Sequence, residues 1–308
     1  MKDNKIKVIA VVGPTASGKS ALSLALAKQL NGEIISCDSM QIYCQMDIGT
    51  AKATKEERAQ IPHHLIDVAQ PWENWSLAEF VQKAHEAIAD VATRGKVPIL
   101  CGGTGLYLDN ILFDTVLSEA PADEKYRQSL ETYTNEELHA MLKQVDAPSA
   151  EANHPNNRRR VVRALEIYHA TGKTKTEWDQ SSRTKTPRYD ALIIGLYAED
   201  REYLYKRIEK RVDEMMQMGL AEEVLAIAPS LGATASQAIG YKEILAGLSG
   251  QMEMSLAVEQ LKTATRRYAK RQLTWFRANP CIHWLDICHM DRESLIKAGM
   301  EIVQKEFS

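Results

Sequence analysis

The sequence has few of the features that mark membrane proteins, disulfide-stabilised proteins and zinc proteins. No apolar run approaches the roughly 20 residues that a membrane-spanning helix needs. The five cysteines are widely spaced and form no C-x-x-C pair, which argues against a disulfide framework or a zinc ribbon. The segment CIHWLDICH (residues 281–289) mixes Cys and His, but its spacing fits no standard zinc finger. We therefore expect a cytoplasmic protein with no membrane partner.

The chain also has little net charge, -3, yet its basic residues gather in two stretches. Residues 156–188 hold nine Lys or Arg against three Asp or Glu. Residues 262–277 hold six Lys or Arg and no acidic residue. Charge clustered in this way within a mildly acidic chain favours surfaces that bind a polyanion.

Strand and helix patterns alternate in the first third of the chain. Apolar runs at residues 7–12, 33–38 and 96–103 are typical of strands buried in a parallel sheet. Between the last two, Ser76 and Glu79 predict a capping box, and Gly95 predicts the end of the same helix. The alternation predicts an α/β fold with a doubly wound parallel sheet, like that of the P-loop NTPases.

The pattern changes after residue 113. Residues 118–187 show helical spacing and no convincing strand, whereas residues 189–198 predict a returning strand. A helix should follow, with Asp200 as its N-cap and Gly219 beyond its end, and a last strand should lie within residues 281–287. We expect an α/β core of residues 1–117 and 189–308 with a helical C-terminal part, and a helical insertion of residues 118–188.

The segment VVGPTASGKSAL (residues 11–22) fits the phosphate-loop pattern G-x-x-x-x-G-K-[ST] between a predicted strand and a predicted helix. Glycines let the backbone wrap a phosphate, and N–H groups of the loop and of the helix start point at the anion. Lys19 adds a charge, Ser20 offers a ligand for Mg²⁺, and Thr15 adds a hydroxyl. The predicted phosphate-binding residues are Gly13, Pro14, Thr15, Ala16, Ser17, Gly18, Lys19 and Ser20.

By itself such a loop favours ATP as the ligand. A nucleotide hydrolase usually also has an acidic residue at the end of a neighbouring strand, but the third strand runs into ILCGGTGLY (residues 99–107) with no acid. Asp38, at the end of the second strand, is the only acidic candidate near the loop. It would serve either the metal or, as a general base, a second substrate, and these residues leave both readings open.

Six motifs in order resemble the tRNA dimethylallyltransferase family, also called tRNA isopentenyltransferase or isopentenyl diphosphate:tRNA transferase. They are GPTASGKS, ISCDSMQIYCQMDIGTAK, PHHLID, CGGTGLYL, HPNNRRRVVRALEIYHATGK and AKRQLTWFR, and the resemblance spans residues 7–286. It implies transfer of a dimethylallyl group from dimethylallyl diphosphate to N6 of the adenine just 3′ of the anticodon. The tRNAs would read codons that begin with U, and diphosphate would be released. Without the C-terminal zinc finger of nucleus-bearing relatives, we expect a bacterial type.

The resemblance also implies roles for single residues. The loop would hold the donor's diphosphate, and Asp38 would act as base on the weakly nucleophilic adenine amine. Thr15, Lys19 and Arg207, with Mg²⁺ on Ser20, would stabilise the leaving diphosphate. Contacts to tRNA are implied at Asp38, Ser39, Met40, Gln41, Thr104, Arg127, Arg159, Arg160, Val161, Val162 and Arg163. The family often has Pro-Gln-Arg at residues 158–160, so Arg159 would exchange a base contact for a phosphate contact.

The expected partners are dimethylallyl diphosphate and the anticodon stem-loop of tRNA, whose target adenine must leave its stack to react. We expect a monomer. In TRRYAKRQLTWFR (residues 265–277), helical spacing puts Arg266, Lys270 and Arg277 on roughly one side. That side would line the tRNA groove or the reaction channel, whereas the aromatic residues Tyr268, Trp275 and Phe276 would pack in the core.

Three other functions fit parts of the sequence. A small-molecule kinase would use the loop for ATP and Asp38 as base on a hydroxyl. Prenyl transfer to a free adenine nucleotide would use the same donor. Both leave the two basic stretches unexplained, and a nucleotide-gated RNA-binding module without catalysis would account for them.

Overall fold

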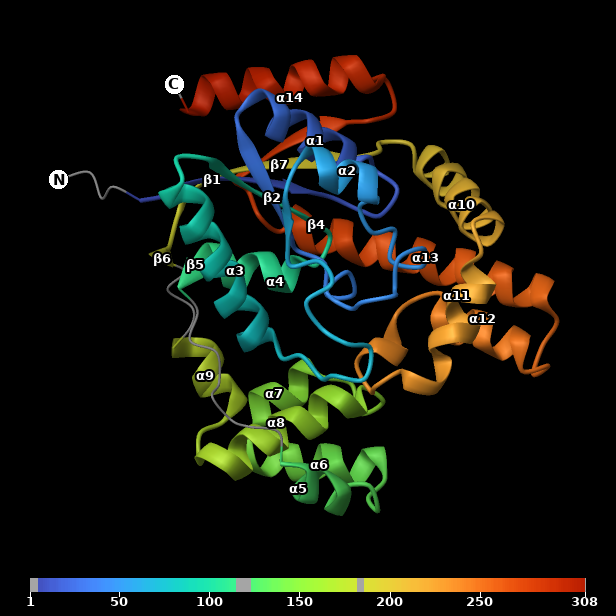
Figure 1. The fold of residues 1–308 in the computed structure, drawn as a ribbon. Coiled ribbons are helices and arrows are strands. Elements are labelled where there is room, and N and C mark those ends of the chain that lie inside the picture. The colour runs from blue at the N-terminus through green and yellow to red at the C-terminus, as the bar shows by residue number, and fades with distance from the viewer. Residues whose placement is uncertain (1–4, 115–122, 182–185, 308) are drawn as a thin grey trace. The chain divides into compact units, whose positions relative to one another are not determined.

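The computed structural model describes residues 5–114, 123–181 and 186–307 (Figure 1). The chain forms two compact units. The core unit is Met1–Leu112 with Arg188–Ser308, and the insertion unit is Phe113–Pro187. The predicted start of the insertion, between residues 117 and 118, lies outside the described residues, and its predicted end lies one residue beyond Pro187.

A six-stranded parallel sheet forms the centre of the core unit. Its strands lie in the order β3 (His63–His64), β2 (Gly32–Ser36), β4 (Val97–Gly102), β1 (Lys7–Val12), β7 (Asp190–Tyr197) and β8 (Ile282–Asp286). All neighbouring strands pair in parallel. The predicted α/β fold with a doubly wound sheet is therefore confirmed, and of the six strands of this sheet only the two-residue β3 was not predicted.

Helices cover both faces of this sheet (Figure 1). The helices of the core unit are α1 (Lys19–Gln29), α2 (Lys55–Gln60), α3 (Leu77–Thr93), α4 (Gly105–Leu112), α10 (Arg201–Gln217), α11 (Leu220–Ile227), α12 (Tyr241–Leu248), α13 (Met254–Arg277) and α14 (Arg292–Phe307). Helices α1 and α14 lie together on one face, and α3 lies on the other. Among the described residues, no helix has the length and apolarity that crossing a membrane requires.

Local capping signals set the helix boundaries as the sequence predicts. The Ser76 hydroxyl accepts the Glu79 N–H and the Glu79 carboxylate accepts the Ser76 N–H, which forms the predicted capping box of α3. Gly95 follows the helix with φ +70°. Asp200 caps α10 by accepting the Glu202 N–H. These bonds satisfy backbone donors that the first helical turn leaves unpaired.

The insertion unit is a small helical cluster with its own core. Its helices are α5 (Glu124–Ser129), α6 (Asn135–Val145), α7 (Ala147–Ala152), α8 (Arg158–Thr171) and α9 (Lys175–Ser181). The apolar core of the unit is formed by Leu130, Leu138, Leu142, Ala150, Val161, Ala164 and Leu165. Two short strands, β5 (Phe113–Asp114) and β6 (Thr186–Pro187), pair antiparallel where the chain enters and leaves the unit. The sequence predicted neither of these strands.

A buried carboxylate ties the sheet to the end of α3. The side chain of Glu33, in β2, is 1% exposed. It accepts hydrogen bonds from both terminal nitrogens of Arg94 (2.5 and 2.6 Å) and from Lys96 Nζ (2.7 Å), and His64 Nε2 lies 2.7 Å away. The Arg94 bonds, followed by those of Lys96 and His64, hold the pKa of Glu33 far below its usual range. The motif PHHLID thus contributes His64 to an ionic cluster at this edge of the sheet.

Replacing Glu33 with Gln should lower the free energy of unfolding at neutral pH by about 2 kcal/mol, the scale of hydrogen bonds to charged groups. The pKa of Glu33 is lower in the folded chain than in the unfolded chain, where it is near 4.5, so the ionic contribution is complete above that value and is lost as pH falls below it. Urea unfolding at pH 7 and at about pH 3.5 tests this, since each pH unit below the unfolded pKa removes about 1.4 kcal/mol. An equal difference at both pH values would contradict an ionic origin.

Candidate active site

Residues 13–18 form the turn between β1 and α1, and Lys19 and Ser20 are the first two residues of α1. Gly13 has φ +141°, and a Cβ placed on it would lie 2.4 Å from the carbonyl oxygen of Leu196 in β7. Only glycine lets the turn pass so close to the neighbouring strand. Gly18 (φ +97°) caps α1 without a side-chain bond, so the first N–H groups of the helix have no side-chain acceptor at the cap. A helix start with this geometry is suited to binding an anion.

Lys19 is the first residue of α1, and its side chain folds back over this loop. Its Nζ donates to the carbonyl oxygen of Pro14 at 2.7 Å. Burial lowers the pKa of Lys19 to about 8, against the opposing influence of Cys101 and Asp38. An anionic ligand would restore the full charge of this lysine, because a nearby negative charge favours the protonated form.

A cavity of about 310 Å³ lies beside the loop, entirely within the core unit. Its charged and hydroxyl side chains come from the loop, from the end of β2 and from α10 and α13. These polar lining residues include Thr15, Lys19, Ser20, Asp38, Arg211 and Arg271. An apolar part of the lining is contributed by Ile208, Val212, Met215, Leu220 and Leu261. The cavity can therefore take a ligand that joins a phosphorylated group to a small apolar group.

Asp38 brings a carboxylate into this cavity from the residues that follow β2. Its Oδ1 accepts the backbone N–H of Met40 at 2.9 Å, and its side chain is half-buried. Burial raises the pKa of Asp38, while the Met40 N–H and the positive charges of Lys19 and Arg211 oppose that rise. A partly buried carboxylate with a raised pKa is well suited to accept a proton from a substrate.

Ser39, Met40 and Gln41 line the cavity next to Asp38. The amide of Gln41 has a fixed orientation. Its Oε1 accepts the Ser36 hydroxyl at 2.9 Å, and its Nε2 donates to the carbonyl oxygen of Thr50 at 3.1 Å.

The arginine that the sequence singled out does not line the cavity. Arg207, on α10, donates from Nε to the carbonyl oxygen of Ala16 at 2.8 Å, so it supports the phosphate loop itself. Arg211, one turn further along α10, lines the cavity, and its charge acts on Asp38. The sequence analysis missed Arg211. The spacing of four residues, which puts both arginines on one helix face, was the signal that could have found it.

Gln272, on α13, is a second residue that the sequence analysis missed. Its Oε1 accepts the backbone N–H of Thr15 at 2.9 Å, and its Nε2 donates to the carbonyl oxygen of Gly103 at 3.0 Å. Its side chain is buried, with the residue 5% exposed. Gln272 therefore joins the phosphate loop to the loop that follows β4.

The face of α13 that lines the cavity differs from the predicted one. It carries Leu261, Thr265, Tyr268, Arg271 and Gln272. The expected lining residue Arg266 instead pairs with Glu209 of α10, and neither Lys270 nor Arg277 lines the cavity. Phe276 is buried as predicted, but Tyr268 faces the cavity and Trp275 is 44% exposed. The predicted side therefore does not line the cavity, because Arg266 is ion-paired and Lys270 and Arg277 are exposed; that it lines a tRNA groove stays a prediction.

The expected tRNA contacts in the insertion unit fall into two groups. Arg159 and Arg160 are exposed at the start of α8. Arg127 and Arg163 pair with the buried Glu166, at 2.7 Å from Arg127 Nε and at 3.4 Å from Arg163 Nη1. Arg127 and Arg163 therefore already serve to neutralise a buried carboxylate.

Three more of the expected tRNA contacts have little side-chain access. Val161 is 0% exposed in the core of the insertion unit, so the expectation that its side chain contacts tRNA is corrected. Val162 is half-buried against the same core. Thr104, in the core unit, is half-buried one residue beyond Gly103 and does not line the cavity.

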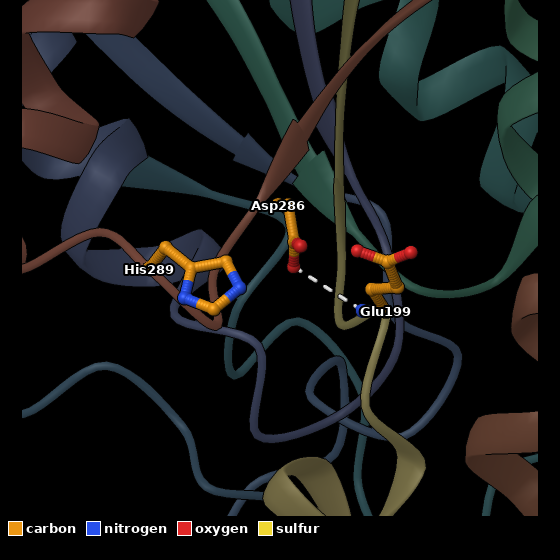
Figure 2. Close-up of side chains that lie close together, drawn as sticks. All are labelled: Glu199, Asp286 and His289. Atoms are coloured by element: carbon orange, nitrogen blue, oxygen red, sulfur yellow. Dashed lines mark hydrogen bonds between the residues drawn. The ribbon is translucent and has the colours of Figure 1, made fainter.

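The segment CIHWLDICH contributes to a separate cluster. Glu199, Asp286 and His289 lie after β7 and at the end of β8, with donor atoms within 4.8 Å of one another (Figure 2). Asp286 Oδ1 accepts the backbone N–H groups of Glu199 (3.2 Å) and Cys288 (3.1 Å). Glu199 and His289 are exposed, and none of the three lines the cavity. Asp286 therefore joins the two chain segments that leave neighbouring strands.

Comparison with known proteins identifies the family. The family model described as IPP transferase matches residues 41–279, and the one described as isopentenyl transferase matches residues 6–69. The chain belongs to the IPP transferase family. The resemblance that the six sequence motifs indicated is therefore confirmed.

Individual family members match over most of their length. The tRNA dimethylallyltransferase of Anoxybacillus flavithermus is 51% identical over 283 residues, which cover 91% of this chain and 90% of that protein. The crystal structure of tRNA delta(2)-isopentenylpyrophosphate transferase from Staphylococcus epidermidis is 42% identical, with a TM-score of 0.72 and coverage of 98% and 99%. A eukaryotic dimethylallyltransferase acting on tRNA is 33% identical, with a TM-score of 0.83 and coverage of 98% and 79%. The phosphate-loop α/β fold is thus common to the family.

Replacing Gln272 with Ala should weaken the binding of inorganic diphosphate about fivefold, because one hydrogen bond of about 1 kcal/mol no longer holds the Thr15 N–H in place. Isothermal titration calorimetry measures this directly. Thr274→Ala is the matched control, since Thr274 lies two residues away on α13 and is exposed. Equal affinities for Gln272→Ala and the unaltered chain would show that the loop keeps its conformation without Gln272.

Proposed function

We propose that the chain transfers a dimethylallyl group from dimethylallyl diphosphate to N6 of the adenine just 3′ of the anticodon. The tRNAs would be those that read codons beginning with U, and diphosphate would be the second product. The names of the relatives supply the transferred group and the tRNA. The observation that carries the proposal is that Asp38 shares one cavity with Lys19, Arg211 and an apolar wall. That set matches an acceptor that loses a proton and a donor that releases an anion.

The acceptor half of the reaction needs a base. The exocyclic amine of adenine is a weak nucleophile, because its lone pair is delocalised into the ring. As the new N–C bond forms, one N–H proton passes to the carboxylate of Asp38. The raised pKa of Asp38 makes the carboxylate a better proton acceptor than an exposed aspartate. The apolar lining beside it, which includes Ile208 and Leu261, would hold the five-carbon chain and keep water from the reacting carbon.

The donor half of the reaction needs charge stabilisation. When the C–O bond breaks, the electron pair stays with the diphosphate, whose negative charge grows. Lys19, Arg211 and the Thr15 hydroxyl would stabilise that charge from the cavity, and Arg207 would act by supporting the loop at Ala16. Preorganised donors of this kind stabilise the transition state without reorganising during the reaction.

Mg²⁺ fits the same place. The hydroxyl of Ser20 is exposed beside Lys19 and lines the cavity, and Mg²⁺ prefers oxygen ligands while keeping several waters. Ser20 would hold the ion together with oxygens of the substrate, and the ion would neutralise part of the diphosphate charge.

The labelled donor tests the proposal against its rivals. With Mg²⁺ and labelled dimethylallyl diphosphate, we expect label in unmodified tRNA and none in AMP or ATP. Asp38→Asn should reduce the single-turnover rate about 10²- to 10⁴-fold, the usual contribution of a general base. Because the phosphate loop keeps its backbone donors and Lys19 in this variant, it should still bind inorganic diphosphate. Turnover of ATP without label in tRNA would instead support a kinase, and a near-normal rate in Asp38→Asn would exclude the carboxylate as base.

The salt dependence of tRNA binding tests the exposed arginines of α8. Arg160→Ala should weaken tRNA binding and reduce the slope of log affinity against log salt by about one, as expected for one lost phosphate contact. Arg163→Ala should change the slope less, because Arg163 pairs with Glu166. Lys143→Ala, which removes an exposed charge from α6 of the same unit, is the control. An unchanged slope in Arg160→Ala would show that Arg160 does not contact the tRNA backbone.

A further inference from the structure

Glu223, on α11, holds the loop of residues 47–51 through its carboxylate. Oε2 accepts the backbone N–H groups of Asp47 (2.8 Å) and Ile48 (2.7 Å), and Oε1 accepts that of Gly49 (2.9 Å). The hydroxyl of Tyr241 donates to Oε1 at 2.7 Å. One carboxylate therefore has four donors, three of them consecutive in the chain and more than 170 positions away. Hydrogen bonds to an ionised acceptor are about twice as strong as neutral ones.

Tyr241 packs against the same loop of residues 47–51 from a second side. Tyr241 is 1% exposed, and a Cβ built on Gly49 would lie 2.7 Å from its ring. Glycine at position 49 is thus required for the loop to lie flat against the ring. Burial raises the pKa of Tyr241, and the Glu223 carboxylate beside it acts in the same direction. The hydroxyl therefore remains a donor over the working pH range.

The anchored loop in turn orients Gln41. The carbonyl oxygens of Thr50 and Ala51 lie 3.1 and 3.4 Å from Gln41 Nε2. The Ser36 hydroxyl, which donates to Oε1, leaves the Gln41 amide only one orientation. Gly49, Thr50, Ala51 and Gln41 all line the cavity that contains Asp38. A shift of the loop would therefore change the direction in which Gln41 presents its amide.

We propose that Glu223 is a positioning residue for the transfer reaction: through residues 47–51 it fixes the Gln41 amide that meets the target nucleotide. This rests on the proposed function and on the contact between Gln41 and tRNA that the family resemblance implies. Glu223 itself does not line the cavity, so it acts only through the loop. The residue also links the acceptor side of the site to α11, which contributes Leu220 to the cavity wall, and to α12, whose N-cap Gly240 lines the same wall.

The first experiment separates the two substrates. In Glu223→Gln the NH₂ group faces the backbone N–H donors, so the loop should lose its fixed position. We expect KM for tRNA to rise about tenfold, the scale of a lost hydrogen bond to a charged group. We expect KM for dimethylallyl diphosphate to stay within about twofold, because the phosphate loop is untouched. Glu222→Gln is the matched control, since it removes the same charge from the exposed neighbouring residue.

The second experiment uses a double-mutant cycle with Gln41→Ala. If Glu223 acts through Gln41, Glu223→Gln should add less than about twofold to KM for tRNA once the amide is absent. A full tenfold effect in the Gln41→Ala background, or an equal rise in KM for both substrates, would overturn the inference. If Gln41→Ala alone leaves KM for tRNA unchanged, the proposed contact is wrong and the inference falls with it.

A third variant keeps the inference testable if Glu223→Gln does not fold. Tyr241→Phe removes one of the four donors and leaves the carboxylate and its charge in place. If Glu223→Gln does not fold, as judged by its circular dichroism and thermal transition, the same cycle is run with Tyr241→Phe. We then expect a rise in KM for tRNA of about threefold that disappears in the Gln41→Ala background. No rise, or a rise that persists in that background, would overturn the inference.

Discussion

The site depends on a carboxylate and a lysine of opposite charge that share one partly buried cavity. Burial favours the neutral form of each, since it raises the pKa of Asp38 and lowers that of Lys19. Each group's charge opposes the shift of the other, and Arg211 adds a further positive charge that favours the ionised Asp38. These three side chains are therefore one electrostatic unit. A change at any of them alters the protonation of the others as well as its own contact with substrate.

The parallel sheet explains how the three groups meet. The carboxyl ends of neighbouring parallel strands lie at one edge, so the segment after β2 and the phosphate loop after β1 open onto the same space. The close approach of Gly13 to Leu196 then fixes how closely the phosphate loop packs against β7. Gln272 adds the only contact from α13 that fixes the backbone of this loop among the hydrogen bonds of the described residues. The sheet thus brings the phosphate loop and Asp38 together, and α1 and α10 add Lys19 and Arg211.

Local signals in the sequence predicted most of the sheet and its helices, because strands buried on both faces and capping boxes depend on adjacent residues. The two-residue strand β3 is too short to show a period. Sequence motifs predicted the phosphate loop and Asp38 as parts of the site. They did not predict Gln272 and Glu223, whose hydrogen-bond partners lie 257 and more than 170 positions away. A glutamine or glutamate on a helix carries no sign of such a partner, since only the tertiary fold brings the two together.

The basic stretch around α8 shows why charge composition overstates a nucleic-acid surface. Arg158 donates to the carbonyl oxygens of Tyr133 and Leu130, and thereby joins two parts of the insertion unit. Arg127 and Arg163 both form ion pairs with the buried Glu166. Without them its charge would be unpaired, which would destabilise the folded state. Only basic side chains that are not already engaged by partners within the protein are available to bind RNA phosphates. In α8 such side chains are concentrated in the first turn, where helix geometry also points backbone N–H groups outward.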